Sequence, residues 1–492
     1  MKNILTIKLL FVLSFFNYSF SQTTITTINS GFWTNPTTWD AGVPQNDDNI
    51  IVNHNLEIDT QAVVTDISIN NITTLYDTIY IKGVLNVESD LTNGVVVLVN
   101  NDIDKGRLGT TSTGELLSEV IWQKWLERCD GWAMYGGPFE LPLVDYGYFH
   151  TGVPGSSFPS FWTNTYLYDE TIPDVDREIG WAVPSNVNNL LPRGQAMYLF
   201  DSSTTSLTES RVIEVKGFTD LTENFNYRLQ YSGVNGSNEN GWNLISNPFL
   251  GTIDWDAPGW NRRRTYNAIW ILDNCTNLYS SYVNGVGVNG GTSLISSGQG
   301  FWVKARRNNP RLRSNRDVIV DDLTEIKSTN HNQIIRLSLN GDEIALVINP
   351  NATASNDTLY DAIKFITANS TIYSELDEKY AINTFDNISS VPMWVKGEGT
   401  LEINLAEFDT TINLMLEDVI TGDMIPINNT TDYYFINTSS GFIHRFNLLF
   451  INITNILQYE HINRESNSKE SIDILGRKVT KEKGINFKSK QR

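Results

Sequence analysis

The sequence predicts an all-β protein made of several domains in series, and two observations support this fold class. First, Val, Ile and Leu recur at every second position in short runs bounded by Gly, Asn and Asp, which is typical of half-buried strands. Second, the chain has 492 residues, 40% of them hydrophobic, which allows about three or four packed domains of roughly 100–200 residues. We therefore expect folded β-domains rather than disorder.

Residues 1–21 are predicted to be a secretory signal peptide. Lys2 and Lys8 accompany an apolar run, and the small residues Ser19 and Ser21 come before Gln22. The apolar run is shorter than the ~20 residues needed to span a bilayer. We therefore expect export through the periplasm, a secreted or outer-surface location, and no integral membrane segment in the mature chain.

Residues 22–105 are predicted to form a short β-solenoid-like segment. NIIVNHNLEID (49–59) and DTIYIKGVLNVESDL (77–91) alternate apolar and polar residues, and no helical period competes. Rungs of this kind bury their faces against one another when they stack. The segment resembles N-terminal parts of bacterial surface proteins that contain right-handed β-helix, on these residues: Trp33, Trp39, Gly42, Pro44, Asp48, Asn49, Gly83, Val84 and Leu85.

The middle of the chain carries one set of motifs twice. GWAMYGGPF (131–139) and GWNLISNPF (241–249) share G-W-x5-P-F, and each is followed by an alternating run that ends in Asp. A Gly-Gln pair then begins a further apolar run. It lies 25 positions after the Asp in both copies, from Asp169 to Gly194 and from Asp273 to Gly298. This order predicts an internal duplication, with modules at 106–224 and 225–328.

The repeated motif is interpreted as a structural element of each module and not as a catalytic or binding site. Trp132 and Trp242 would each bury on the order of 150–250 Å². At about 25 cal/mol per Å², this burial stabilises each module by several kcal/mol. Pro138 and Pro248 are expected to end their strands, because proline cannot donate a ladder hydrogen bond.

The second module resembles a recurrent unit of secreted bacterial proteins that use the type IX secretion system. In those proteins the unit precedes a β-sandwich and a sorting tail, and it carries no catalytic role. The matching residues are Gly241, Trp242, Asn243, Leu244, Asn247, Pro248, Asp254, Trp255, Gly298, Gln299, Gly300 and Phe301. The first module departs from this pattern because Gly137 stands where the unit has Asn.

Residues 329–455 alternate as strands with turn signals and resemble the β-sandwich of the same secreted proteins. Residues 456–492 are polar and rich in Lys and Ser, and they resemble a type IX sorting tail. The resemblance implies that the type IX machinery is a partner. An ordinary basic tail is the alternative. The sorting-signal residues are Asp473, Leu475, Gly476, Arg477, Lys478 and Gly484.

The charge balance argues against general nucleic-acid binding. The formal net charge is −20, whereas nucleic-acid binding needs a basic footprint. Two basic segments are exceptions: Arg262 to Arg264, and the run from Lys304 to Arg316. Each is interpreted either as a solvated loop or as a docking patch for a polyanion.

The sequence offers no motif for metal or nucleophilic catalysis. The five histidines lack zinc-ligand spacing, and neither a nucleophile elbow nor a phosphate-binding loop is present. NNDIDKG (100–106) departs from a calcium loop in the place of its Gly, so an ordinary loop is expected. We expect no cofactor, no metal and no enzyme activity. The spacing of Cys129 and Cys275 does not establish whether they form a disulfide.

Two tryptophans in a Gly/Pro/Asp loop, Trp255 and Trp260, are the weak candidate ligand site, together with Arg262, Arg263 and Arg264. Their rings could stack on sugars, but core packing is the favoured interpretation, because tryptophan is highly buried on average. The predicted function is non-catalytic adhesion or binding of extracellular glycan, matrix or surface protein. The alternative is a secreted polysaccharide lyase or glycoside hydrolase that uses the N-terminal solenoid. The sequence does not exclude it, because a catalytic pair of carboxylates is recognised by its separation in space and not by its spacing in the sequence.

Overall fold

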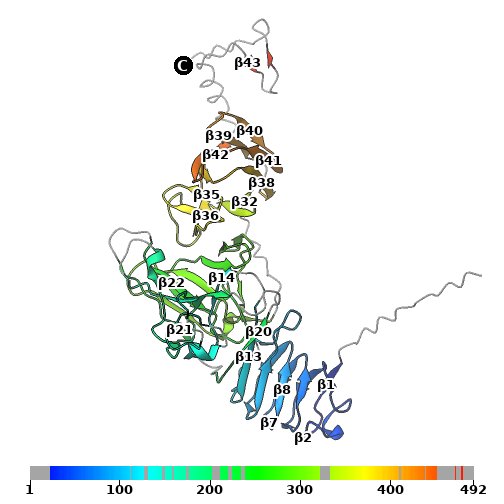
Figure 1. The fold of residues 1–492 in the computed structure, drawn as a ribbon. Coiled ribbons are helices and arrows are strands. Elements are labelled where there is room, and N and C mark those ends of the chain that lie inside the picture. The colour runs from blue at the N-terminus through cyan, green and yellow to red at the C-terminus, as the bar shows by residue number, and fades with distance from the viewer. Residues whose placement is uncertain are drawn as a thin grey trace, which may run out of the picture.

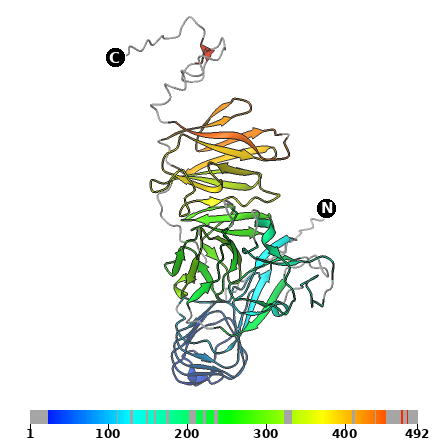
Figure 2. The same ribbon diagram turned by 90° about the vertical axis from the view of Figure 1, so that its left-hand side faces the viewer.

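The computed structural model describes residues 23–110, 112–126, 131–146, 150–157, 160–172, 177–201, 211–219, 224–233, 239–321, 333–408, 412–437, 439–451, 471–472 and 478–479. These residues form many strands and no α-helix, so the all-β class is confirmed. Their short 3-10 helices are η1 (Pro36–Thr38), η2 (Leu143–Tyr146), η3 (Arg177–Gly180) and η4 (Arg316–Val318). Three β-rich parts follow one another in space, from the blue N-terminal part to the orange C-terminal part (Figures 1 and 2).

The N-terminal part contains three parallel sheets that the chain visits in turn. It returns to the first sheet after 17 or 18 residues, since Ile50 lies opposite Ile67 and Ile67 opposite Leu85. The first sheet contains β1 (Thr24–Thr26), β3 (Asn49–Val52), β6 (Ile67–Ile69), β9 (Val84–Val87) and β12 (Arg107–Leu108). The second contains β2 (Gly31–Phe32), β4 (Leu56–Ile58), β7 (Thr73–Leu75) and β10 (Leu91–Thr92).

The third sheet contains β5 (Ala62–Val64), β8 (Thr78–Ile81), β11 (Val95–Leu98), β13 (Glu119–Leu126) and β20 (Arg211–Gly217). β13 continues the parallel stack beyond residue 105, and β20 pairs with it in the antiparallel direction. The alternation of apolar and polar residues along each strand decides which face of the sheet is buried. Val52, Ile69 and Val87 lie opposite one another on the first sheet, and none of them is exposed.

The two copies of the repeated motif form two antiparallel sheets with the same strand order. The first contains β14 (Gly131–Tyr135), β19 (Met197–Asp201), β16 (Thr165–Tyr168) and β17 (Trp181–Ala182). The second contains β22 (Trp242–Ser246), β29 (Gly300–Lys304), β25 (Ile269–Asp273), β26 (Leu278–Val283) and β27 (Val286–Val288). In the first sheet β19, which follows Gly194-Gln195, lies between β14 and β16. In the second sheet β29, which follows Gly298-Gln299, lies between β22 and β25.

Strand register also coincides between the copies. Trp132 lies opposite Phe200, and Trp242 lies opposite Lys304, which are the equivalent positions after Gly194 and Gly298. Both of these glycines have a positive φ, 81° and 67°. That conformation favours glycine because a side chain is strained there. The shared order in the sequence therefore corresponds to a shared register in space.

The two copies contact each other reciprocally. The Gly-Gln pair of each copy meets the first strand of the other copy, as in the two-fold arrangement of a symmetric dimer. The contacts are the bridges Tyr135↔Gln299 and Gln195↔Ile245, and the 2.9 Å hydrogen bonds from Gly136 N–H to Gly298 O and from Ser246 N–H to Gly194 O.

Three small sheets complete the middle part. They pair β15 (Leu141–Pro142) with β18 (Leu190–Leu191), β30 (Arg311–Ser314) with β21 (Phe225–Tyr227) and β24 (Trp260–Arg263), and β23 (Thr252–Asp254) with β28 (Leu294–Ile295) and β31 (Ile319–Val320). Pro138 and Pro248 are buried and follow the last residues of β14 and β22, as strand-ending prolines do.

The C-terminal part is one sheet of eleven strands that nearly closes into a barrel. β40 (Met424–Ile427) and β41 (Thr430–Phe435) stand at opposite ends of the strand order, yet they are adjacent in sequence. Because successive Cα atoms are at most ~3.8 Å apart, the two ends of the sheet lie close together. The other strands are β32 (Gln333–Leu339), β33 (Asp342–Ile348), β34 (Ala362–Ile363), β35 (Ile372–Glu375), β36 (Lys379–Phe385), β37 (Ser390–Val395), β38 (Gly399–Glu407), β39 (Asn413–Asp418) and β42 (Ile443–Ile451).

An aromatic cluster joins the second copy to the C-terminal barrel. The Trp242 ring lies 4.7 Å from that of Trp270 and 4.4 Å from that of Phe365, a barrel residue. Trp302 lies 5.7 Å from Phe365, and the Trp270 indole N–H donates a 2.7 Å hydrogen bond to the carbonyl of Ile363. One core therefore spans both parts.

Two buried ion pairs fix the barrel. The Nζ atom of Lys364 lies 2.5 Å from Asp342, and the guanidinium of Arg445 lies 2.6 Å from Asp418. Burial opposes ionisation of Asp418, but hydrogen bonds from Arg445 and from backbone N–H groups outweigh it and lower the pKa of this carboxyl. Lys364, Asp418 and Arg445 therefore stabilise the barrel fold.

Truncation of Trp242 is predicted to cost more than truncation of Trp132. Trp242 is 1% exposed, whereas Trp132 is half-buried against Tyr198, with 4.5 Å between ring centroids. Trp242→Ala should lower the free energy of unfolding by about 3–5 kcal/mol, as large core truncations do, and Trp132→Ala by less. Chemical denaturation of both variants measures this, and equal losses would contradict the assigned burial.

Removal of Arg445 is predicted to leave the buried carboxylate of Asp418 without its ion-pair partner. Arg445→Met should destabilise the protein by about 3–5 kcal/mol at neutral pH, because a buried carboxylate loses its partner. Asp418 has a lowered folded pKa, so its contribution exists above the unfolded value near 3.8 and is lost as pH falls. The penalty should therefore shrink in acid, and the double variant Asp418→Leu/Arg445→Met should recover stability. A penalty that is independent of pH would refute the pairing argument.

Candidate functional site

Trp255 does not present a face to solvent. It is 0% exposed, its ring lies 4.7 Å from that of Trp260 and 6.0 Å from that of Phe301, and its indole N–H donates to the carbonyl of Asn267. Trp260 is half-buried and stacks on Tyr227 at 5.9 Å. This burial supports core packing, the interpretation favoured for Trp255, over stacking on a ligand, because protein groups already cover the ring.

Arg262 is also used within the fold. Its guanidinium lies 4.1 Å from the centroid of the Trp255 ring and donates to the carbonyl of Trp255 and to the side chain of Asn267. Burial lowers the pKa of Arg262 to about 10, against the influence of nearby acids. Arg263 is exposed and Arg264 follows the end of β24, so the structure separates these two residues from the packed Trp255, Trp260 and Arg262.

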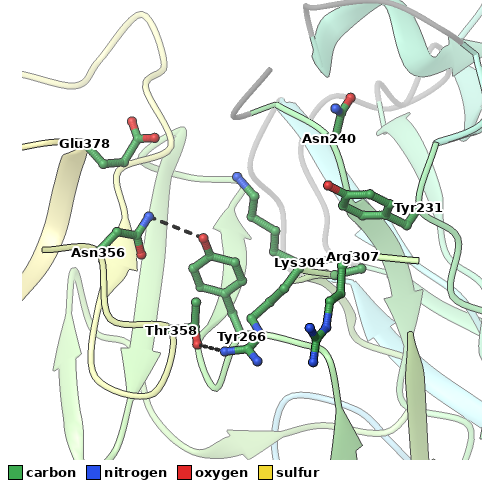
Figure 3. A pocket seen from close by; sticks show the side chains of 10 residues that line it. Tyr231, Asn240, Tyr266, Lys304, Arg307, Asn356, Thr358 and Glu378 are labelled. Atoms are coloured by element: carbon green, nitrogen blue, oxygen red, sulfur yellow. Dashed lines mark hydrogen bonds between the residues drawn. The ribbon is translucent and has the colours of Figure 1, made fainter. Parts of the chain in front are cut away.

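A pocket of about 390 Å³ lies where the second copy meets the C-terminal barrel. Pockets of this size at domain interfaces are common sites for small ligands. Lys304 ends β29, and Tyr266 follows β24. Figure 3 shows the side chains that line this pocket: Tyr231, Asn240, Tyr266, Lys304, Ala305, Arg306, Arg307, Asn356, Thr358 and Glu378.

Hydrogen bonds across the pocket tie its two walls together. The amide of Asn356, in the loop between β33 and β34, donates a 3.3 Å hydrogen bond to the hydroxyl of Tyr266. Arg306 donates to the hydroxyl of Thr358 in the same loop. Burial raises the pKa of Tyr266 to about 12, with a further contribution from the negative charge of Glu378. The phenol is therefore neutral and available as a hydrogen-bonding group.

Lys304 brings a cation to the edge of the aromatic cluster. It is 5% exposed, and its Nζ lies 4.7 Å from the ring centroid of Trp242 and 5.6 Å from that of Tyr266. Such distances are those of cation–π contacts. The junction that holds the two parts together therefore also positions this side chain in the wall of the pocket.

Two acceptors at the pocket have no hydrogen-bond donor among the residues that the structure describes. These buried atoms are Oδ1 of Asn356 and Oε2 of Glu378. Buried polar atoms are nearly always hydrogen-bonded, so each needs a further donor from solvent or from a ligand. Donors from Lys304 and Arg306 lie in the same lining. The pocket thus combines donors, acceptors and two phenol rings, a set that suits a ligand with many hydroxyl groups.

The residues that the sequence offered as a ligand site, Trp255, Trp260 and Arg262 to Arg264, do not line this pocket. Tyr266, Lys304 and Asn356 are far apart in the chain, and only the packing of the barrel on the second copy brings them together. The available signal was the basic run that starts at Lys304. No signal in the sequence marked Asn356 or Glu378.

The described histidines serve local structure. His54 contacts Thr27, His150 is buried between Thr165 and the carbonyl of Leu143, and His444 contacts Asn447. Burial lowers the pKa of His150, which favours a neutral ring. Across the part of the chain that the structure describes, no group of three or more His, Cys, Asp or Glu side chains is arranged to hold a metal ion.

Several predicted features lie at or beyond the edge of the described residues. Cys275 is disulfide-bonded, and Cys129 lies outside the described residues. Lys478 belongs to a short hairpin of β43 (Ser471–Ile472) and β44 (Lys478–Val479). Also outside the described residues lie the signal peptide and the sorting residues Asp473, Leu475, Gly476, Arg477 and Gly484.

Comparisons with protein-family models, curated proteins and solved structures found no match for the chain. In the described residues, no helix has the length and apolar character to cross a membrane.

Proposed function

We propose that this protein is an exported, non-catalytic binder of extracellular glycan and that the pocket beside Tyr266 and Lys304 is its binding site. The observation that carries the proposal is the lining: phenol rings, amides, a carboxylate and cations converge in one pocket of about 390 Å³. Sugar hydroxyls both donate and accept hydrogen bonds, so they can satisfy Asn356 and Glu378 together with the cationic donors.

The arrangement of the parts supports the same role. The three parallel N-terminal sheets have the pairing of a short β-solenoid, and the curved C-terminal sheet can be divided into the two layers of a β-sandwich. In this proposal the solenoid extends the protein away from the cell, and the duplicated module and the sandwich hold the pocket. The resemblance to type IX substrates supplies the route of export and the partner machinery.

Glycan binding is predicted to depend on Tyr231. Tyr231→Ala removes one ring from the pocket wall, so affinity for a bound oligosaccharide should fall by about tenfold, or 1.4 kcal/mol. A glycan array identifies the oligosaccharide, and calorimetry measures its affinity. Tyr434→Ala is the matched control, because Tyr434 is a 64% exposed tyrosine on β41, away from the pocket. Both variants should melt like the parent protein.

Two results would refute this assignment. One is the absence of glycan binding by the parent protein on the array. The other is equal affinity of Tyr231→Ala and Tyr434→Ala for the oligosaccharide. Release of shortened products from a bound polysaccharide would instead favour the alternative function, a polysaccharide lyase or glycoside hydrolase.

Export is predicted to depend on the tail. Deletion of residues 471–492 should leave the glycan affinity unchanged, since every pocket residue lies before that segment. The truncated protein should accumulate in the periplasm of a host with type IX secretion. Fractionation with immunoblotting measures this. Full release of the truncated protein into the medium would show that the tail is not the sorting signal.

A further inference from the structure

An exposed arginine surface continues from the pocket along β24 and β30. Arg263 and Arg311 lie directly opposite each other on these antiparallel strands, and both are exposed. Arg313 is exposed on the same face of β30, two residues further along. We call Arg263, Arg264, Arg307, Arg311 and Arg313 the arginine surface.

The charges of the arginine surface are not balanced within the described residues. No ion pair there joins any of these five side chains to an acid. Like charges directly opposite each other on neighbouring strands are destabilising. Desolvation and repulsion from Arg263, Arg307 and Arg311 lower the pKa of Arg264. In a chain of net charge −20, this concentration of cations is the opposite of the overall balance.

The arginine surface is physically continuous with the pocket. The backbone N–H of Arg306 donates a 2.8 Å hydrogen bond to the carbonyl of Arg264, and the guanidinium of Arg264 donates to the carbonyl of Asn308. Arg306 and Arg307 themselves line the pocket. A linear ligand that fills the pocket can therefore extend over Arg264 onto Arg263 and Arg311.

We infer that the ligand is an acidic polysaccharide, whose carboxylate or sulfate groups bind the arginine surface while one sugar residue occupies the pocket. This inference rests on the proposed function. Arginine suits these anions because its planar fork donates two parallel hydrogen bonds to a carboxylate or sulfate. The remaining negative charge of the protein disfavours broad contact with a nucleic acid or an anionic membrane. A narrow polymer that touches only this surface avoids that repulsion.

The test compares an oligogalacturonate with a neutral maltooligosaccharide of the same length. Affinities are measured at ~50 and ~300 mM NaCl, because screening weakens contacts between exposed charges. The acidic oligosaccharide should bind at least about tenfold more tightly than the neutral one at low salt, and this advantage should shrink at high salt. DNA duplexes and anionic phospholipid vesicles serve as competing polyanions.

Matched variants assign the effect to the arginine surface. Arg311→Gln should weaken binding of the acidic oligosaccharide at least about fivefold and leave neutral binding unchanged. Lys216→Gln removes the same charge from an exposed site on β20 and should change neither affinity. Arg263→Gln/Arg311→Gln should melt no lower than the parent, because it removes a repulsive pair.

The outcomes separate the two proposals. If the neutral sugar binds through Tyr231 but Arg311→Gln behaves like Lys216→Gln, the acidic ligand is refuted and the glycan site stands. If DNA or vesicles bind more tightly than the acidic oligosaccharide, the acidic ligand is also refuted. If the parent protein binds a glycan on the array but not the oligogalacturonate, only the acidic ligand is refuted; if it binds no glycan on the array, the proposed function fails together with this inference.

Discussion

The packing of Trp242, Trp270 and Trp302 against Phe365 is the contact on which the rest of the candidate site depends. It fixes the second copy of the repeated motif to the C-terminal barrel, and the pocket lies between these two parts. Lys304 contacts the Trp242 ring and lines the pocket as well. Because the same residues build the core and position the side chains that line the pocket, small changes in the aromatic cluster should also alter the pocket.

The repeated motif has different surroundings in its two copies. In the second copy the barrel covers the tryptophan-bearing face, so Trp242 is buried. In the first copy Trp132 packs among aromatic residues of its own module and is half-buried. The Gly-Gln pair of each copy also contacts the Gly-Trp strand of the other copy, so the two copies pack directly against each other.

The sequence was informative where periodicity decides the structure. Alternation at period two predicted the strands from Asn49 to Val87, and the spacing from Asp to Gly predicted equivalent positions that the structure places in equal register. The site was less predictable. Trp255 sits in a loop rich in Gly, Pro and Asp, which made it a weak ligand candidate, but Arg262 and Trp260 cover it. Asn356 and Glu378 belong to barrel loops, and only tertiary packing brings them to Tyr266.

The proposed binding site lies where the second copy meets the barrel. Hydrogen–deuterium exchange with and without an oligogalacturonate locates the ligand, because backbone protection reports which segments the ligand covers. Binding at the pocket should protect residues 263–267, 304–313 and 356–358 and leave residues 49–108 of the N-terminal sheets unchanged. Protection confined to residues 49–108 would refute the pocket as the binding site and favour a ligand groove on the N-terminal sheets.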